Sequence, residues 1–431
     1  MFNAQNIITM KRIISKLLQV SMIIVLVACF GMAYGQNNDE YTTVYGVVKD
    51  SKTRDAIPFA SISIPGSNIG TVSNSEGEFT IKVLKSLEAT EIEISHIGYV
   101  NSKFKIQPSN GKPGSYYVDP HMLSLQEVVV RPESPDMLVR MAIKNVGQNY
   151  ANTPSMMKAF YRETIKQRRD YLSISEAVVD IYKSSYTSFE NDRVKIFKGR
   201  KGVNIKKADT LLVKLQGGPA VSLLLDVIKN PDYLFTNDIF TDYKFELTGI
   251  VNIDNKLNYV VNVIPVGVQP YPLFNAKFYI SQDNLALSMA EFSLDLSDKT
   301  KAESFYIKKK PMGLTMTPTS TSYLVTYKMQ PNGKYYVNYV RNEIKFKADW
   351  KKKWFNSYYT VMSEMAITSI SNKEAAKIPS DEAFKQNMVL NDRIQDLQDE
   401  NFWGSSNIIE PEQSIQNAIK KIAKQMLKSQ N

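Results

Sequence analysis

The chain contains only two histidines, His96 and His121, and these are the first candidates for catalytic chemistry. A zinc hydrolase typically holds its metal with histidine nitrogens and a carboxylate. Neither histidine lies in an H-E-x-x-H or H-x-x-E spacing, and no G-x-S-x-G elbow exists to present a serine to either one. We therefore interpret His96 as a strand residue and His121 as a loop residue. We predict no catalytic residue, no metal site and no cofactor.

Neighbouring acids are the other candidates for catalysis. Asp381 with Glu382, and Asp399 with Glu400, lie in polar segments. Nothing there indicates the burial that raises the pKa of a catalytic acid. A hydrolase with an unrecognised carboxylate site is therefore an alternative hypothesis only. The Ser-Asn-Ser-Glu-Gly stretch at 73–77 has too few oxygen ligands for Ca²⁺ and predicts a tight turn.

The first 35 residues have the pattern of a secretory signal peptide. Three cations precede an apolar run at 17–32, and Ala33 and Gly35 supply small residues before Gln36. We therefore exclude residues 1–35 from the folded protein and predict export, to the periplasm or to the outer membrane.

The single cysteine, Cys29, lies inside this segment and leaves two outcomes open. The Leu-Val-Ala-Cys sequence fits a lipobox, in which Cys29 would become the lipidated first residue. Cleavage before Gln36 would instead leave a mature chain without any cysteine, and so without a disulfide.

The chain carries a formal net charge of +10, of which three positive charges belong to the leader, so the mature charge is +7. A moderately basic surface suits anionic membranes or glycans, and export argues against nucleic acid as a partner. One short basic stretch has a tryptophan at each end, which suits either a solvated strand end or contact with a membrane interface. Its residues are Trp350, Lys351, Lys352, Lys353 and Trp354.

Short β-rich runs between 46 and 100 alternate with turn residues, which is typical of an antiparallel sandwich. In chain order they contain G-V-V-K-D, I-P-F-A-S-I, G-T-V-S-N-S-E-G-E-F and I-S-H-I-G-Y. This order resembles the carboxypeptidase-regulatory-like domain. The resemblance implies a seven-strand, transthyretin-like (prealbumin-like) β-sandwich at 41–130, of a kind found at the front of many Gram-negative envelope proteins.

The end of this region also resembles TonB-dependent receptors that carry the same domain. There an L-x-E-V-V-V run leads to the plug, and here L-Q-E-V-V-V at 125–130 is followed by R-P-E-S-P instead. We interpret 127–130 as a final or linker strand. An accessory component of a TonB-dependent outer-membrane uptake system is an alternative function.

The remainder predicts a larger α+β domain, so the fold class is mainly β. Residues 131–157 form a linker and a helix, capped by Ser134 and carrying Met137 on its apolar face. Residues 158–370 predict serial hairpins, with a loop at 199–207, an Asp-Asn turn at 254–255 and an Asn-Gly turn at 332–333. Residues 371–431 predict a polar tail and a C-terminal amphipathic helix.

Serial hairpins predict one curved antiparallel sheet that needs helices over its apolar face, and the candidates are 137–149 and 219–228. The layout resembles the half-barrels of periplasmic lipoprotein carriers, which would imply an apolar groove that holds an acyl chain. We therefore predict a non-enzymatic, exported envelope protein. It would be a binding or adaptor module whose partner is an envelope protein, a glycan, a lipid or the outer-membrane surface.

Overall fold

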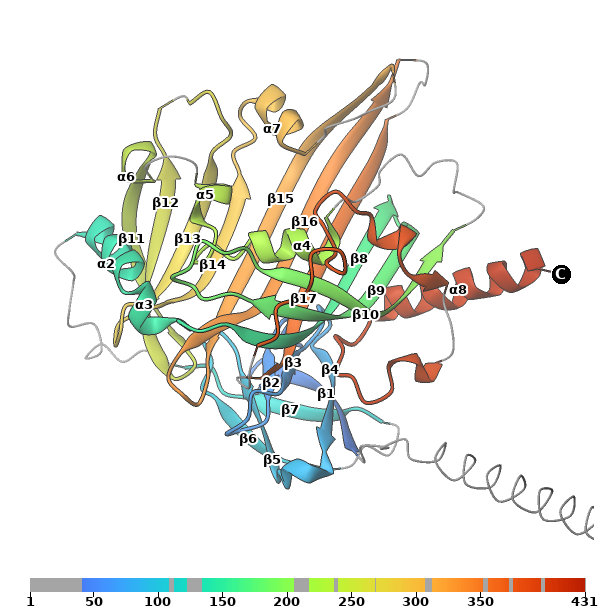
Figure 1. Ribbon diagram of the computed structural model, residues 1–431, viewed down its shortest axis with the longest axis horizontal. Helices are drawn as coiled ribbons and strands as arrows, with labels where there is room; N and C mark the ends of the chain where they lie inside the picture. The colour runs from blue at the N-terminus through green and yellow to red at the C-terminus, as the bar shows by residue number, and fades with distance from the viewer. Residues whose placement is uncertain are drawn as a thin grey trace, which may run out of the picture.

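The computed structural model describes residues 41–107, 112–121, 134–204, 217–235, 239–267, 269–306, 312–351, 356–371, 375–396 and 400–430 (Figure 1). The predicted signal peptide with Cys29, and the predicted strand at 127–130, lie outside these residues. No helix of the described ranges is long and apolar enough to cross a membrane.

The N-terminal domain is a seven-strand sandwich of two sheets, as predicted. One sheet has the order β4-β1-β7 and the other β3-β2-β5-β6. The strands are β1 (Tyr41–Asp50), β2 (Ser61–Ser63), β3 (Gly70–Val72), β4 (Glu78–Leu84), β5 (Glu91–Ser95), β6 (Ser102–Lys105) and β7 (Gly114–Val118).

Alternation of side chains builds the core of the sandwich. In β4, Phe79, Ile81 and Val83 point inward while the residues between them are partly exposed, as the two-residue period of a strand requires. The turn before β4 forms as predicted. Asn74 Oδ1 accepts hydrogen bonds from two backbone amides of that turn. Gly77 has φ +75° and lies so close to the carbonyl of Val48 that a Cβ there would approach it to 2.9 Å.

The second domain is built on one 11-stranded sheet with the order β11-β12-β13-β14-β15-β16-β17-β8-β9-β10-β18. Neighbouring strands are antiparallel except for the pair β10 and β18. Its strands are β8 (Ser155–Gln167), β9 (Asp170–Lys183), β10 (Arg193–Val203), β11 (Tyr243–Ile253), β12 (Lys256–Pro265), β13 (Phe274–Ser281), β14 (Leu287–Leu294), β15 (Leu314–Met329), β16 (Tyr335–Trp350), β17 (Ser357–Ser371) and β18 (Gln395–Asp396).

Several short helices and one longer helix lie around this sheet (Figure 1). They are α2 (Pro135–Lys144), α3 (Val146–Asn149), α4 (Gly218–Leu224), α5 (Pro231–Leu234), α6 (Ile239–Asp242), α7 (Lys299–Tyr306) and α8 (Gln413–Gln430). We call the side of the sheet that packs against α2 and α4 the helix face; its core includes Leu138, Leu223 and Val261. The two predicted covering helices therefore occupy the predicted face.

The helix α2 begins as predicted, since the Ser134 hydroxyl accepts a hydrogen bond from the amide of Met137 and Pro135 takes the first turn. The predicted apolar face was wrong at Met137, which is 52% exposed, whereas Val139 is buried. The helix is rotated by about one residue relative to the sequence pattern, because Leu138, Val139 and Ala142 together face the sheet.

The loop predicted at 199–207 was also wrong where the structure describes it. Residues 199–203 continue strand β10 after a bulge between Ile196 and Lys198. Gly199 is required there because a Cβ would come within 2.5 Å of the side chain of Ile394. The glycine that suggested a loop instead lets the C-terminal segment, residues 375–396 and 400–412, pack against the strand at Ile394.

That C-terminal segment wraps around the β10 edge of the sheet. Phe384 and Leu390 join the core of the helix face, and β18 then pairs with β10 and covers the edge. Beyond it, Trp403 is buried against Phe160 on the opposite side of the sheet. The sequence of 371–405 looks polar, yet its scattered apolar side chains pack on both faces of the sheet. Finally α8 buries Ile415 and Ile422 against β9.

The sandwich docks on this second side of the sheet, which we call the sandwich face. The rings of Phe59 and Tyr339 stack at 5.8 Å, and Val72 shares an apolar cluster with Phe160 and Trp403. The two domains are therefore joined by a common core.

Candidate functional site

The predicted membrane-contact residues are only partly described. Trp350 packs, half-buried, against an apolar cluster at the end of the long β15–β16 hairpin, and Lys351 after it is exposed. Lys352, Lys353 and Trp354 lie outside the described residues. The membrane contact stays a prediction.

The two histidines lie on the sandwich and do not form a metal site with acids. His96 follows β5, its ring lies 5.5 Å from that of Tyr99, and burial lowers its pKa to about 4. The backbone amide of His121 donates to the carbonyl of Gly98 at 2.8 Å. Among the described residues, no group of three or more His, Cys, Asp or Glu side chains is placed to hold a metal ion.

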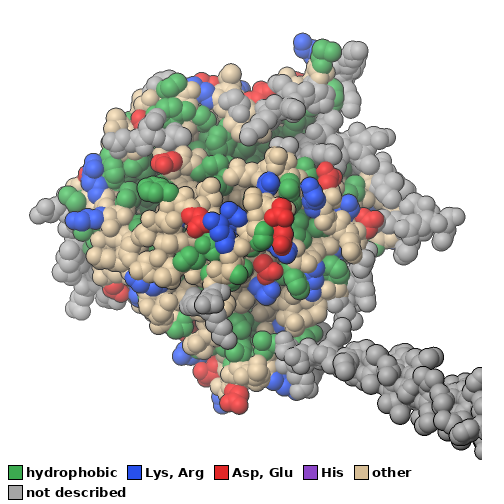
Figure 2. Space-filling model, in the orientation of Figure 1, with side chains coloured by type: hydrophobic (Ala, Val, Ile, Leu, Met, Phe, Trp, Pro, Cys, Tyr) green, Lys and Arg blue, Asp and Glu red, His purple; other side chains and the backbone are tan. Residues whose placement is uncertain are grey.

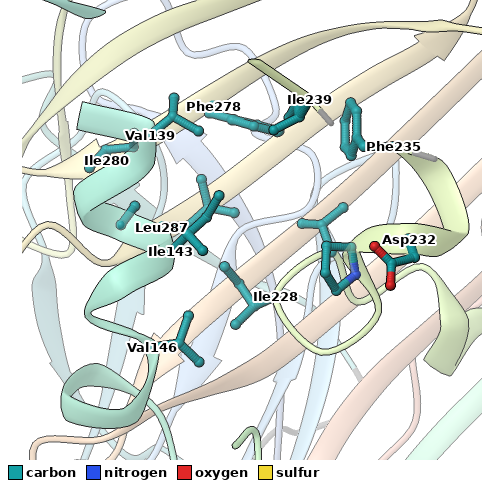
Figure 3. A pocket seen from close by; sticks show the side chains of 13 residues that line it. Val139, Ile143, Val146, Ile228, Asp232, Phe235, Ile239, Phe278, Ile280 and Leu287 are labelled. Atoms are coloured by element: carbon teal, nitrogen blue, oxygen red, sulfur yellow. The ribbon is translucent and has the colours of Figure 1, made fainter. Parts of the chain in front are cut away.

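The candidate site is a pocket of about 260 Å³ between the sheet and the helices (Figure 3). The side chains of α2, with Val146 of α3, form one wall. Residues in 227–232 with Phe235 and Ile239 form the other, and strands β13 and β14 form the floor. The lining residues are Val139, Ala142, Ile143, Val146, Val227, Ile228, Pro231, Asp232, Phe235, Ile239, Phe278, Ile280 and Leu287.

The lining is aliphatic and aromatic except for Asp232. Phe278 and Ile280 point into the pocket together because they are two residues apart on the same face of β13. Hydrophobic side chains also reach the surface between α2 and α5, and they gather in a hollow over β13–β15 (Figure 2). A cavity with this lining offers many apolar contacts and very few polar ones, as binding sites for apolar ligands do.

A buried polar network holds the second wall in place. Asp226 directly precedes the lining residues Val227 and Ile228, and is itself completely buried. Its carboxylate accepts hydrogen bonds from Lys183 Nζ at 2.8 Å, Tyr186 Oη at 3.0 Å and Tyr327 Oη at 2.8 Å. These donors come from the sheet and from the segment after β9, so the network ties the wall to the floor.

The charges in this network are compensated. Lys183 Nζ also lies 2.7 Å from Asp192 Oδ2. Burial alone would lower the pKa of Lys183, but Asp192 and Asp226 together raise it above its ordinary value. Burial raises the pKa of Tyr186 well above 10. At neutral pH Lys183 is therefore charged and Tyr186 is protonated. Both remain hydrogen-bond donors to Asp226, and the network holds the pocket wall against the sheet.

A second buried charge cluster lies on the sandwich face. Arg162, fully buried, contacts Glu176 at 2.8 Å and Glu364 at 3.0 Å, and its Nη2 donates to the carbonyl of Ile409 at 2.8 Å. Arg200 completes the cluster through Glu176. The charged side chains come from β8, β9, β10 and β17, and the carbonyl of Ile409 belongs to the C-terminal segment, so the cluster attaches that segment to the sheet.

Glu163 is a buried acid on β8. Burial raises the pKa of Glu163 to about 7, and the hydroxyl of Tyr161 donates to its Oε2 at 2.8 Å. Its neighbours across the sheet are Ser175 and Ser363. Sequence reasoning missed this acid, because Glu163 lies in an ordinary mixed β-strand pattern.

The comparisons with known proteins bear on the first domain. The model of the CarboxypepD_reg-like domain matches residues 44–130. This region is a carboxypeptidase-regulatory-like domain. The assignment covers under a third of the chain. A comparison with the curated proteins gave no match.

Solved structures resemble the chain only slightly. An outer membrane lipoprotein-sorting protein domain from Vibrio parahaemolyticus is 7% identical with a TM-score of 0.26, over 56% of this chain and 95% of that one. A LolA superfamily protein from Nitrosomonas europaea is 14% identical with a TM-score of 0.20, over 57% and 99%. MucA/MucB from Pseudomonas aeruginosa is 12% identical with a TM-score of 0.18, over 57% and 100%. Scores this low do not establish a shared fold.

Sequence reasoning anticipated a groove beneath helices, and both predicted covering segments supply lining residues, but it missed the part of the wall after residue 228. It named the helix at 219–228 as a cover, whereas the pocket wall is the segment that follows α4. The available signal was the apolar run Leu223–Ile228, interrupted by Asp226 and followed by Pro231. A single acid inside such a run indicates a buried polar anchor.

Proposed function

We propose that the second domain binds one acyl chain of a lipid or lipid-modified molecule in the pocket between α2 and the wall formed by 227–232, Phe235 and Ile239. The protein would act as a non-enzymatic, exported envelope protein, and the sandwich would hold the second domain in the envelope assembly. The observation that carries this proposal is the apolar lining of the pocket, with one carboxylate at its rim.

The free energy of binding that the apolar pocket can supply favours a chain of several carbons. Burial of a methylene contributes about 0.8 kcal/mol, whereas association costs on the order of 4–15 kcal/mol of lost freedom. A ligand with only a few carbons would therefore bind weakly. We expect affinity to rise about fourfold for each added methylene until the pocket is full, and then to level off.

The rim of the pocket allows a direct test. Ile143 lines the pocket and is 49% exposed, so Ile143→Glu places a charge at the mouth without disturbing the buried core. Met137 lies on the same helix, is 52% exposed and does not line the pocket. Met137→Glu is therefore the matched control.

The measurement is titration with a fluorescent fatty-acyl probe, followed by displacement with unlabelled chains of eight to sixteen carbons. We expect the wild type and Met137→Glu to bind with the same chain-length dependence, and Ile143→Glu to lose at least tenfold in affinity. Equal binding by the two variants, or an affinity independent of chain length, would show that the pocket does not hold the chain.

The partner of the sandwich stays a prediction. An envelope protein or a glycan remains the expected partner there. The TonB-associated role and the hydrolase role have no specific support in the pocket, because the pocket contains no nucleophile, imidazole or paired acids.

A further inference from the structure

The mouth of the pocket is defined by its exposed lining residues. These are Ile143 on α2 and Pro231 and Asp232 at the start of α5. Asp232 is the only charged residue of the lining (Figure 3). A ligand whose chain fills the apolar interior would leave its polar end beside this carboxylate.

The α2 side of the mouth carries two cations, Arg140 and Lys144, which flank Ile143 along the helix without lining the pocket. The guanidinium of Arg140 on α2 lies 3.6 Å from the ring centroid of Phe240, the residue after the lining residue Ile239. Lys144 follows Arg140 by one helical turn and is exposed, so the two cations share the side of α2 next to Ile143. Asp136 contacts Arg140 at 3.5 Å and offsets part of this charge.

The two sides of the mouth therefore carry opposite charges. We propose that the pocket selects a lipid whose head group holds both an ammonium and a phosphate, as a phosphoethanolamine head group does. This inference deepens the proposed function and rests on it. The ammonium would face Asp232, and the phosphate would face Lys144 and Arg140.

Other common head groups complement only one side. A fatty-acid carboxylate or a phosphoglycerol head group gains from the cations of α2 but places no cation near Asp232. Exposed charge pairs are weak because water and salt screen them. The expected preference for the head group with both charges is therefore at most about fivefold, and we take about two- to fivefold as the range that the measurement should find.

The test is a competition read by native mass spectrometry of the mature chain. The protein is incubated with vesicles that hold equal amounts of phosphatidylethanolamine and phosphatidylglycerol with identical acyl chains. We expect wild-type protein to carry the ethanolamine lipid two- to fivefold more often. Asp232→Asn should bring the ratio to about one while lipid stays bound, and Lys144→Glu should lower the occupancy of both lipids.

Glu246→Gln is the matched control, because Glu246 is an exposed acid on β11 that does not line the pocket. It should keep the wild-type ratio. Equal occupancy of the two lipids in the wild type, or an unchanged preference in Asp232→Asn, would overturn the head-group inference alone. Absence of any lipid from the wild type would overturn the proposed function as well.

Discussion

Lys183 and Asp226 form an ion pair in the interior of the second domain, with Nζ 2.8 Å from Oδ2 and both side chains at most 1% exposed. The pair joins the last residue of β9 to the segment that forms one wall of the pocket. It thereby connects the rigid sheet to the part of the molecule that a ligand would contact.

Replacement of Lys183 by Met should be strongly destabilising, because it leaves Asp226 and Asp192 buried without their shared cation. Removal of one partner of a buried pair costs about 3–5 kcal/mol. Urea unfolding followed by tryptophan fluorescence would measure the change. Lys158→Met is the control, since Lys158 pairs with Asp180 at 2.8 Å on the surface of the same sheet. That variant should change stability by less than about 1 kcal/mol.

The shared core between the domains predicts that they unfold together. Phe59 stacks on Tyr339, and the guanidinium of Arg341 lies 4.9 Å from the Phe59 ring centroid. Calorimetry should therefore record one transition for the wild type, and two separated transitions for Phe59→Ala. Tyr117→Ala removes an exposed ring of the sandwich and should keep the single transition. Two transitions already present in the wild type would contradict the shared core.

Glu163 predicts a loss of stability at rising pH. Burial raises its pKa from 4.5 to about 7 in the folded chain, so the folded state holds a proton that the unfolded state has released between these values. Stability from this group therefore falls as pH rises from about 4.5 to 7, by roughly 3 kcal/mol in total. Chemical unfolding of wild type and Glu163→Gln at several pH values would measure the difference.

The comparison with Glu163→Gln isolates this effect, because glutamine keeps the shape and does not titrate. The stability of the wild type relative to the variant should decline across this pH range and then become constant. A difference that does not vary with pH would show that Glu163 is not held in its protonated form.

His96 predicts the opposite dependence of stability on pH. Burial lowers its pKa from 6.5 to about 4, so the unfolded chain binds a proton that the folded chain rejects. The stability from neutral His96 is present above about pH 6.5 and is lost as pH falls toward 4. His96→Gln should remove this acid-side loss of roughly 3 kcal/mol. If wild type and His96→Gln lose stability in parallel on acidification, the histidine is not buried as a neutral ring.

The sequence predicted the elements whose pattern is local. The motifs at 46–100 predicted the sandwich, and the turns at Asp254–Asn255 and Asn332–Gly333 predicted hairpins that the structure contains. Both Asp254 and Asn255 have positive φ, as the tight hairpin turn requires. The N-cap of α2 could be predicted equally well, because Ser134 and Pro135 act within one helical turn.

The features that sequence analysis missed depend on contacts between residues that are far apart in the chain. Trp403 lies in a polar stretch, and only its contact with Phe160, more than two hundred residues earlier, explains its burial. Gly199 suggested a loop because a sequence pattern cannot show that Ile394 packs over it. The pocket combines residues from α2 and α3, from 227–232 with Phe235 and Ile239, and from β13 and β14, and no spacing along the chain brings these together.

The central claim is that the pocket holds an acyl chain, and the most direct test is the mass of the protein as its own cells make it. Wild type, Ile143→Glu and Met137→Glu would be exported from the host, purified without denaturant and weighed by native mass spectrometry. We predict one lipid on the wild type and on Met137→Glu, and a bare chain for Ile143→Glu. A bare wild type, or equal lipid on all three, would contradict the claim.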